Sequence, residues 1–284
     1  MLNNTMLAGV TLVLATLGLG QGAYALSSDN FSVQVGAESF YWREFDAGLR
    51  LLEEKGARLR VGVGLDNFQR VDSGFLYGMD GAVHLGRVDY DGQACSVVNP
   101  AQCVPYKSDT DYFGLELEGL GGFRFAQAKH GVEIFGGMGV DSWLRKIKAG
   151  DGVAGAKEEY FVLNSKFGAG FFHRLDSWSY HLQAGIKYPF YVYEYVLQDT
   201  ADDLDLSPRG RASGFANFRV NLAPRARNPV SLIVYYDSYR FAESDLELQT
   251  VNGAPLVIAD NTYYARQPES RQDVFGIQLA IQFR

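Results

Sequence analysis

A strict alternation of residue types at the end of the chain constrains its fold more than any other feature. From position 275 onward every second residue is large and apolar, namely Phe275, Ile277, Leu279, Ile281 and Phe283. Only Gly, Gln and Ala stand between them. Because successive side chains of a β-strand point to opposite faces, residues 272–284 are predicted to form a strand with one wholly apolar face.

The first 25 residues differ sharply from the rest, since they contain no Asp, Glu, Lys or Arg. Residues 6–20 are almost entirely apolar, and Ala23-Tyr24-Ala25 has the small-x-small form of a signal-peptidase site. A single membrane helix is the alternative, but about 15 apolar residues are fewer than the roughly 20 that span a bilayer. We therefore expect residues 1–25 to be a secretory signal peptide and residues 26–284 to form one β-barrel domain.

The same period-2 pattern recurs along the chain. The predicted strands are 31–43, 58–66, 74–90, 112–125, 132–147, 160–173, 178–196, 214–222, 230–241 and 272–284. Residues 46–56 are interpreted as a charged connection, and residues 244–270 as the longest loop, with a hairpin tip at Val251-Asn252-Gly253. Short turns alternate with longer polar connections. The pattern predicts an all-β, up-and-down antiparallel barrel of about ten strands, with eight or twelve as alternatives.

The closing strand, with an aromatic residue almost at its end, resembles the last strand of small bacterial outer-membrane β-barrels, which are single chains with signal peptides. The resemblance implies a transmembrane barrel in the outer membrane of a Gram-negative bacterium, in contact with lipid and lipopolysaccharide. It also implies that the assembly machinery recognises the alternating apolar residues 275–283. An aromatic content of 14% fits the girdles of such barrels. A soluble β-sandwich or lipocalin-like barrel is the alternative, which mixed charges on the polar strand faces disfavour.

Charged residues on the polar strand faces are expected to pair across the interior. The predicted network contains Glu38, Arg60, Asp80, His84, Glu116, Glu118, Glu133, Asp141, Arg145, Lys166, His181, Lys187, Arg219 and Asp237. Asp66 is a further inward acid. A barrel of about eight strands is filled by its own side chains, so a slightly larger one is expected to be plugged. Unpaired charges in so narrow a space would be costly.

The chain has two cysteines, Cys95 and Cys103, within a polar stretch. In an exported protein they are predicted to form a local disulfide. No Cys or His has metal-ligand spacing, so we expect neither a metal site nor a cofactor. The acidic run at residues 199–205, DTADDLD, could gather oxygen ligands for a cation, but a solvated outer loop is the favoured interpretation.

The sequence contains no nucleotide-binding or hydrolase motif, and no catalytic residue is assigned. A net charge of −7 gives no reason to expect nucleic-acid binding. The leading hypothesis is a structural scaffold that binds an extracellular or envelope protein through its outer loops. The alternatives are a narrow channel for small solutes and an outer-membrane hydrolase similar to the omptins, which use Asp and His at the outer rim.

Overall fold

The computed structural model describes residues 30–68, 73–95, 103–150, 153–198, 201–222, 224, 226–258 and 260–283; the predicted signal peptide and Arg284 lie outside them. Ten long strands form the body of the molecule. They are β1 (Asn30–Asp46), β2 (Leu49–Asp66), β3 (Gly74–Cys95), β4 (Cys103–Gln127), β5 (His130–Ile147), β6 (Ala156–Arg174), β7 (Trp178–Leu197), β10 (Ser213–Leu222), β11 (Val230–Ala242) and β18 (Glu269–Phe283). In the described part of the chain, no helix is long and apolar enough to cross a bilayer.

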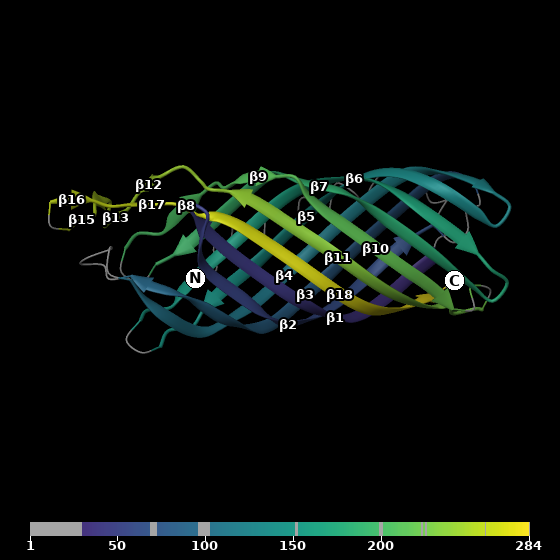
Figure 1. Ribbon diagram of the computed structural model, residues 1–284, viewed down its shortest axis with the longest axis horizontal. Coiled ribbons are helices and arrows are strands. Elements are labelled where there is room, and N and C mark those ends of the chain that lie inside the picture. Colours follow the sequence, from purple (N-terminus) through teal and green to yellow (C-terminus); the bar gives the residue numbers. More distant parts are fainter. Residues whose placement is uncertain are drawn as a thin grey trace.

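The ten strands close into an antiparallel barrel. Each strand from β1 to β7 pairs with the next, β18 pairs with both β1 and β11, and β10 pairs with both β11 and β7. The strands are tilted against the long axis of the molecule (Figure 1). The prediction of an all-β, up-and-down barrel with ten strands is therefore confirmed.

The predicted alternation sets which side chains face outward. On β18 the residues Phe275 to Phe283 of odd number are between 43% and 54% exposed, while Ala280 and Gln282 between them are at most 2% exposed. The same pattern exposes Val61 and Val63 on β2 and buries Arg60. The barrel thus presents apolar side chains to its surroundings, which suits a wall that faces lipid. Recognition of β18 by assembly machinery stays a prediction.

The connections identify the two ends of the barrel. β1 begins opposite the end of β18, with Phe31 facing Phe283, and the connections at residues 67–73, 128–129, 175–177 and 223–229 lie at this same end. The connections at residues 148–155, 198–212 and 243–268 lie at the other end and are longer. Since outer-membrane barrels have short periplasmic turns and long outer loops, we name these the periplasmic end and the outer end.

One predicted connection is wrong. Residues 46–56 are not a charged loop, because β1 continues to Asp46, the chain reverses at Ala47 and Gly48, and β2 begins at Leu49. Both turn residues have positive φ, 48° for Ala47 and 81° for Gly48, as a two-residue type I′ hairpin requires. The charged residues suggest a connection, but the strands continue beyond the apolar band of the barrel. There Glu53 and Lys55 face outward and Glu54 faces inward.

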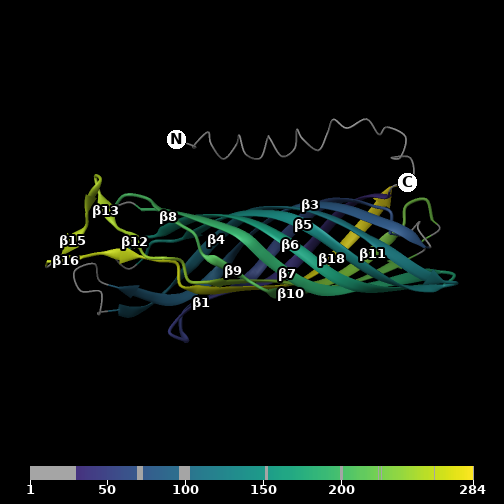
Figure 2. The same cartoon turned by 90° about the horizontal axis from the view of Figure 1, so that it is seen from above.

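The outer end carries further short strands in segments that were predicted as loops. They are β8 (Leu204–Leu206), β9 (Arg209–Arg211), β12 (Glu247–Leu248), β13 (Thr250–Val251), β14 (Ala254–Pro255), β15 (Val257–Ile258), β16 (Asn261–Thr262) and β17 (Tyr264–Ala265). The last six form three two-stranded ribbons within residues 243–268, which we name the outer arm. The arm projects beyond the barrel (Figure 2). The predicted hairpin tip is present, with positive φ at Asn252 and Gly253.

Candidate functional site: the barrel interior

An aromatic layer fills the outer half of the interior. Its buried members are Phe40, Trp42, Leu52, Val88, Tyr90, Tyr106, Tyr112, Trp143, Tyr160, Val162, Val192, Tyr239, Phe241 and Val274. β1 and β6 are five strand pairings apart in a ring of ten, so they lie on opposite walls. Even so, the rings of Trp42 on β1 and Tyr160 on β6 are 5.4 Å apart, and Trp143 on β5 stacks on Tyr160 at 4.8 Å. Side chains therefore cross the lumen at this level and block it.

One arginine holds several carboxylates within this layer. Arg145, which is 1% exposed, lies 3.1 Å from Glu44, 3.0 Å from Glu54 and 2.6 Å from Glu158. Glu54 also accepts hydrogen bonds from Thr110 at 2.7 Å and from Tyr112. A buried charge needs partners that replace its water shell, and Arg145 finds them on several strands. The contacts thereby join β1, β2, β4, β5 and β6. The cluster supplies Arg145 with three carboxylate partners inside the aromatic layer.

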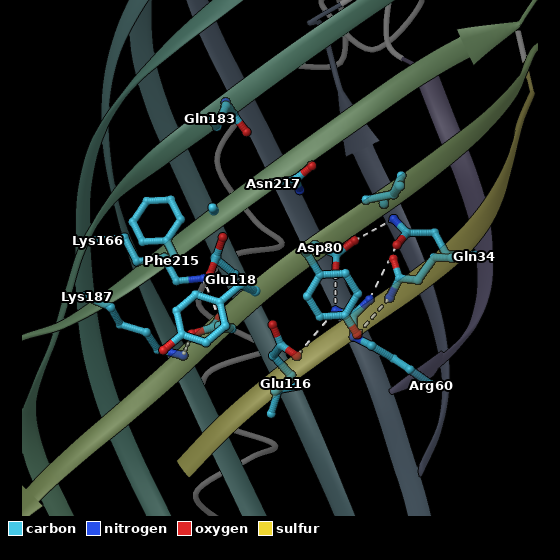
Figure 3. Close-up of a pocket in the computed structure, with 18 of the residues that line it drawn as sticks. Gln34, Arg60, Asp80, Glu116, Glu118, Lys166, Gln183, Lys187, Phe215 and Asn217 are labelled. Carbon is cyan, nitrogen blue, oxygen red and sulfur yellow. Dashed lines mark hydrogen bonds and ion pairs between the residues drawn. The ribbon is translucent and has the colours of Figure 1, made fainter. Parts of the chain in front are cut away.

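Below this layer lies a cavity of about 160 Å³ with charged walls. On one wall, Arg60 of β2 contacts Asp80 at 2.7 Å and Glu116 at 3.3 Å. Gln34 donates a hydrogen bond to Asp80 at 2.6 Å. Figure 3 shows Gln34, Arg60 and Asp80 together on this side of the cavity. Close by, Arg58 contacts Glu38 at 2.7 Å.

The facing wall carries two lysines. Lys166 of β6 contacts Glu118 and lies 3.1 Å from Asp237, while Lys187 of β7 lies 2.9 Å from Asp237. Lys187 is also 3.6 Å from Asp141. Figure 3 shows Glu118 beside the two lysines and Glu116 between the two walls. Cations and anions are thus interleaved around the cavity.

A third group of charges lies toward the periplasmic end. Glu133 accepts a hydrogen bond from Arg124 at 2.6 Å, and its other oxygen lies 2.6 Å from Nε2 of His181. The ring of Phe68 packs edge-on against His181, with 5.6 Å between centroids. Arg219 of β10 reaches Asp66 of β2 at 3.0 Å, which is a further contact across the lumen. The interior is therefore crossed again at the periplasmic end of the cavity, where Asp66 and Arg219 line it.

All fourteen predicted network residues face the interior, but they belong to separate groups. Eleven of them line the cavity: Glu38, Arg60, Asp80, His84, Glu116, Glu118, Asp141, Lys166, Lys187, Arg219 and Asp237. Arg145 lies in the aromatic layer, Glu133 and His181 lie toward the periplasmic end, and Arg219 bonds to Asp66. His84 lines the cavity, and its Nε2 lies against Gly114 with no hydrogen-bond partner among the described residues.

Several interior residues were missed by the sequence analysis. They are Glu44, Glu54, Arg58, Arg124, Glu158 and Glu194. Their inward direction follows from residue parity along each strand. Glu54 and Arg58 are even-numbered like the inward Arg60 of β2, and Arg124 is even-numbered like the inward Glu118 of β4. Glu54 was overlooked because the segment around it was assigned to a connection.

The cysteines and the acidic run have separate outcomes. The β3–β4 register places Cys95 opposite Cys103; the side chain of Cys95 lies outside what the structure describes, and the disulfide stays a prediction. In the acidic run, Asp203 accepts hydrogen bonds from Tyr195 and Gln198, and Asp205 accepts one from Tyr193. Asp199 is outside the described residues. No group of three His, Cys, Asp or Glu in the described part of the chain could hold a metal ion.

The four histidines of the chain are all described, and none lies at the outer end. His130 faces His173 across strands β5 and β6 beside the periplasmic turns. His181 lies near the start of β7, and His84 lies within β3. An Asp–His pair at the outer rim, as a hydrolase of omptin type would need, therefore has no histidine available.

Replacing Lys166 with Met is expected to destabilise the barrel, because Glu118 and Asp237 would lose a shared counter-charge. We expect a loss of about 3 kcal/mol in the free energy of unfolding, at the low end for a broken buried pair because the cavity admits water. Denaturant unfolding of the refolded protein in lipid vesicles measures this. Lys129→Met, which breaks an exposed pair with Asp176, is the control and should cost less than about 1 kcal/mol. Equal losses in the two variants would contradict the interior network.

No family model matches the sequence, and no curated protein matches it either. Among solved structures, the chain is similar to the outer membrane protease OmpT from Escherichia coli, with a TM-score of 0.50 and 11% identity over 90% of this chain and 98% of that chain. Lower similarity is found to the translocator domain of the autotransporter NalP from Neisseria meningitidis, with a TM-score of 0.38 and 10% identity over 99% and 96% of the two chains. The attachment invasion locus protein Ail of Yersinia pestis has a TM-score of 0.33 and 9% identity over 90% and 99%.

At these identities the likeness concerns the fold alone. That fold, the closed ring of ten strands and the apolar outer wall agree with one another. The chain has the fold of a ten-stranded bacterial outer-membrane β-barrel, and its apolar outer wall suits contact with lipid.

Proposed function

We propose that the protein is a non-conducting, membrane-anchored scaffold that acts on an extracellular or envelope protein partner through its outer arm. The observation that carries this proposal is the aromatic layer, in which Trp42, Trp143 and Tyr160 meet from opposite walls of the barrel. A channel would need a continuous polar path through this level. Among the described residues, the cavity reaches Trp143 and Tyr239 of the layer and does not supply such a path.

The outer arm has the properties of a binding surface. Its exposed apolar side chains are Leu246, Leu248, Val257 and Tyr264. Its ribbons are two-stranded, so their outer edges keep backbone groups available for an added strand. The acids Glu243, Asp245, Glu247 and Asp260 outnumber the one base, Arg266. A partner with an extended, apolar and basic segment would fit this surface.

Contacts with neighbouring loops hold the arm in place. The carboxylate of Asp202, in the β7–β8 connection, accepts hydrogen bonds from Thr250 Oγ1 at 2.7 Å and from the backbone N–H groups of Asn252 and Gly253 at 3.1 and 2.8 Å. At the base of the arm, Arg266 bonds to Asp46, the last residue of β1, at 2.8 Å. A surface held in this way binds at a lower entropic cost than a free loop does.

The aromatic layer predicts the electrical behaviour of the protein. The purified wild type, inserted into a planar bilayer, should give no steady single-channel current. Trp42→Ala combined with Tyr160→Ala removes rings from both walls and should produce measurable conductance. Circular dichroism and the heat-dependent shift on electrophoresis check that this variant folds. Large and stable currents from the wild type would reject the scaffold and favour a channel for small solutes.

We name the three hydrogen bonds to the Asp202 carboxylate the Asp202 clamp. Its presence predicts how mobile the outer arm is. The hydrogen bond from Thr250 and those from Gly253 and Asn252 hold the pKa of Asp202 below its usual range, because they favour the carboxylate. The clamp is therefore present at neutral pH and is lost as the pH falls through that lowered pKa. In Asp202→Ala, hydrogen exchange of the amides at residues 250–253 should become severalfold faster.

The control for the clamp is Asp245→Ala, which removes a carboxylate of the same arm that makes none of these bonds. Its exchange at residues 250–253 should match that of the wild type. Unchanged exchange in Asp202→Ala would show that the arm is held by other contacts, and the proposal of a pre-ordered binding surface would lose its support.

A further inference from the structure

Four arginines occupy facing positions on four neighbouring strands near the outer end. Strand register places Arg43 of β1 opposite Arg271 of β18, Arg271 opposite Arg240 of β11, and Arg240 opposite Arg211 of β9. On the three long strands they have the same parity as the lipid-facing residues, and Arg211 shares the face of Arg240. We name Arg43, Arg271, Arg240 and Arg211 the arginine row. Their side chains are between 27% and 56% exposed.

Two carboxylates hold the row but do not neutralise it. Asp273 lies 2.5 Å from Arg43 and 2.6 Å from Arg240. Glu269 lies 3.0 Å from Arg211 and 2.9 Å from Arg271. Four guanidinium groups against these two carboxylates leave an excess of two positive charges within the row and its bound acids. Each guanidinium has five N–H donors, so donors remain for a further acceptor.

The row differs in extent from other parts of the same rim, where Lys146 of β5 faces Lys157 of β6 but also Asp111 of β4. Arg43, at one end of the row, faces Glu53 of β2 on its other side. Lys55 of β2 faces Asp89 of β3, and Arg87 of β3 faces Asp111 of β4. Such pairs of opposite sign stabilise a sheet, whereas like charges directly opposite each other destabilise it. Four facing arginines therefore have an electrostatic cost in the isolated protein. A bound anion would offset that cost.

The position of the row indicates the source of the anion. Immediately below it, the rings of Tyr236 and Phe275 lie 4.8 Å apart on the outer wall, and the hydroxyl of Tyr236 donates a hydrogen bond to Asp273 at 2.7 Å. Below them, β18 continues as the exposed apolar residues Ile277 and Leu279. Aromatic residues mark the membrane interface in such barrels. The row therefore lies at the height of the outer-leaflet headgroups.

We propose that the arginine row is a binding site for the phosphate groups of lipopolysaccharide, the anionic lipid of the outer leaflet. The guanidinium groups would bind phosphate oxygens in pairs, a geometry that arginine provides and lysine does not. The acyl chains of the same lipid would lie along the apolar outer face of β18. The site is on the wall of the barrel and does not depend on the proposed role of the outer arm.

The test compares a row variant with a charge-matched control. The row variant combines Arg43→Gln, Arg240→Gln and Arg271→Gln; the control combines Arg87→Gln, Lys146→Gln and Lys157→Gln on other strands of the rim. Binding of lipopolysaccharide to the refolded full-length mature protein in zwitterionic detergent is measured by titration. The row variant should bind about tenfold more weakly or worse than the wild type, because charge-assisted hydrogen bonds are lost. The control should change the affinity less than about twofold.

Two further binding measurements identify the part of the lipid that the row recognises. Dephosphorylated lipopolysaccharide should bind the wild type as weakly as the intact lipid binds the row variant. Inorganic phosphate should compete only weakly, because it lacks the acyl chains. The proposal is overturned if the wild type and the row variant bind equally, if dephosphorylation has no effect, or if phosphate alone displaces the lipid completely. Where the glutamine variant does not fold, the matching Arg→Lys triple variant is used, and it should show an intermediate loss; wild-type affinity in that variant would also overturn the arginine-specific site.

Discussion

The demand that every backbone polar group be hydrogen-bonded within the bilayer governs the whole structure. Strands can meet it only in a closed sheet, which here requires the pairing of β10 with β7. Closure turns the apolar face of each strand toward lipid. The side chains of the opposite face are confined to a narrow interior. The charges that the sequence carries on that second side must then find partners inside. The barrel wall and the ion pairs are thus two results of one constraint.

The interior solves this problem differently at each level. Toward the outer end, rings from opposite walls meet and enclose Arg145 with its glutamates. In the middle, Arg60, Lys166 and Lys187 share carboxylates around a small cavity. Near the periplasmic end, Arg219 reaches Asp66. Side chains from different walls thus cross the lumen at two levels, within the aromatic layer and at the periplasmic end of the cavity.

The sequence predicts strand faces well, because a period of two is a local property. β18 and β7 were predicted to within a few residues, because their alternation of apolar and polar residues is unbroken. The segment at residues 46–56 was predicted wrongly because both faces of a strand become polar once it leaves the bilayer. Residue parity also does not show which inward residues lie at the same height along the barrel axis. The pairing of Glu133 with Arg124 and His181, and the arginine row, depend on strand register, which no single strand encodes.

The accessibility of the tryptophans tests the plugged barrel most directly. Trp42 and Trp143 are 0% and 4% exposed inside the aromatic layer, whereas Trp178 is 38% exposed on the outer wall. In proteoliposomes, brominated lipids should quench Trp178 fluorescence. In the Trp178→Phe variant, the remaining fluorescence should resist both brominated lipids and aqueous acrylamide. Efficient quenching of that variant by acrylamide would mean that water reaches Trp42 and Trp143 freely, and the account of a lumen closed by its own side chains would be wrong.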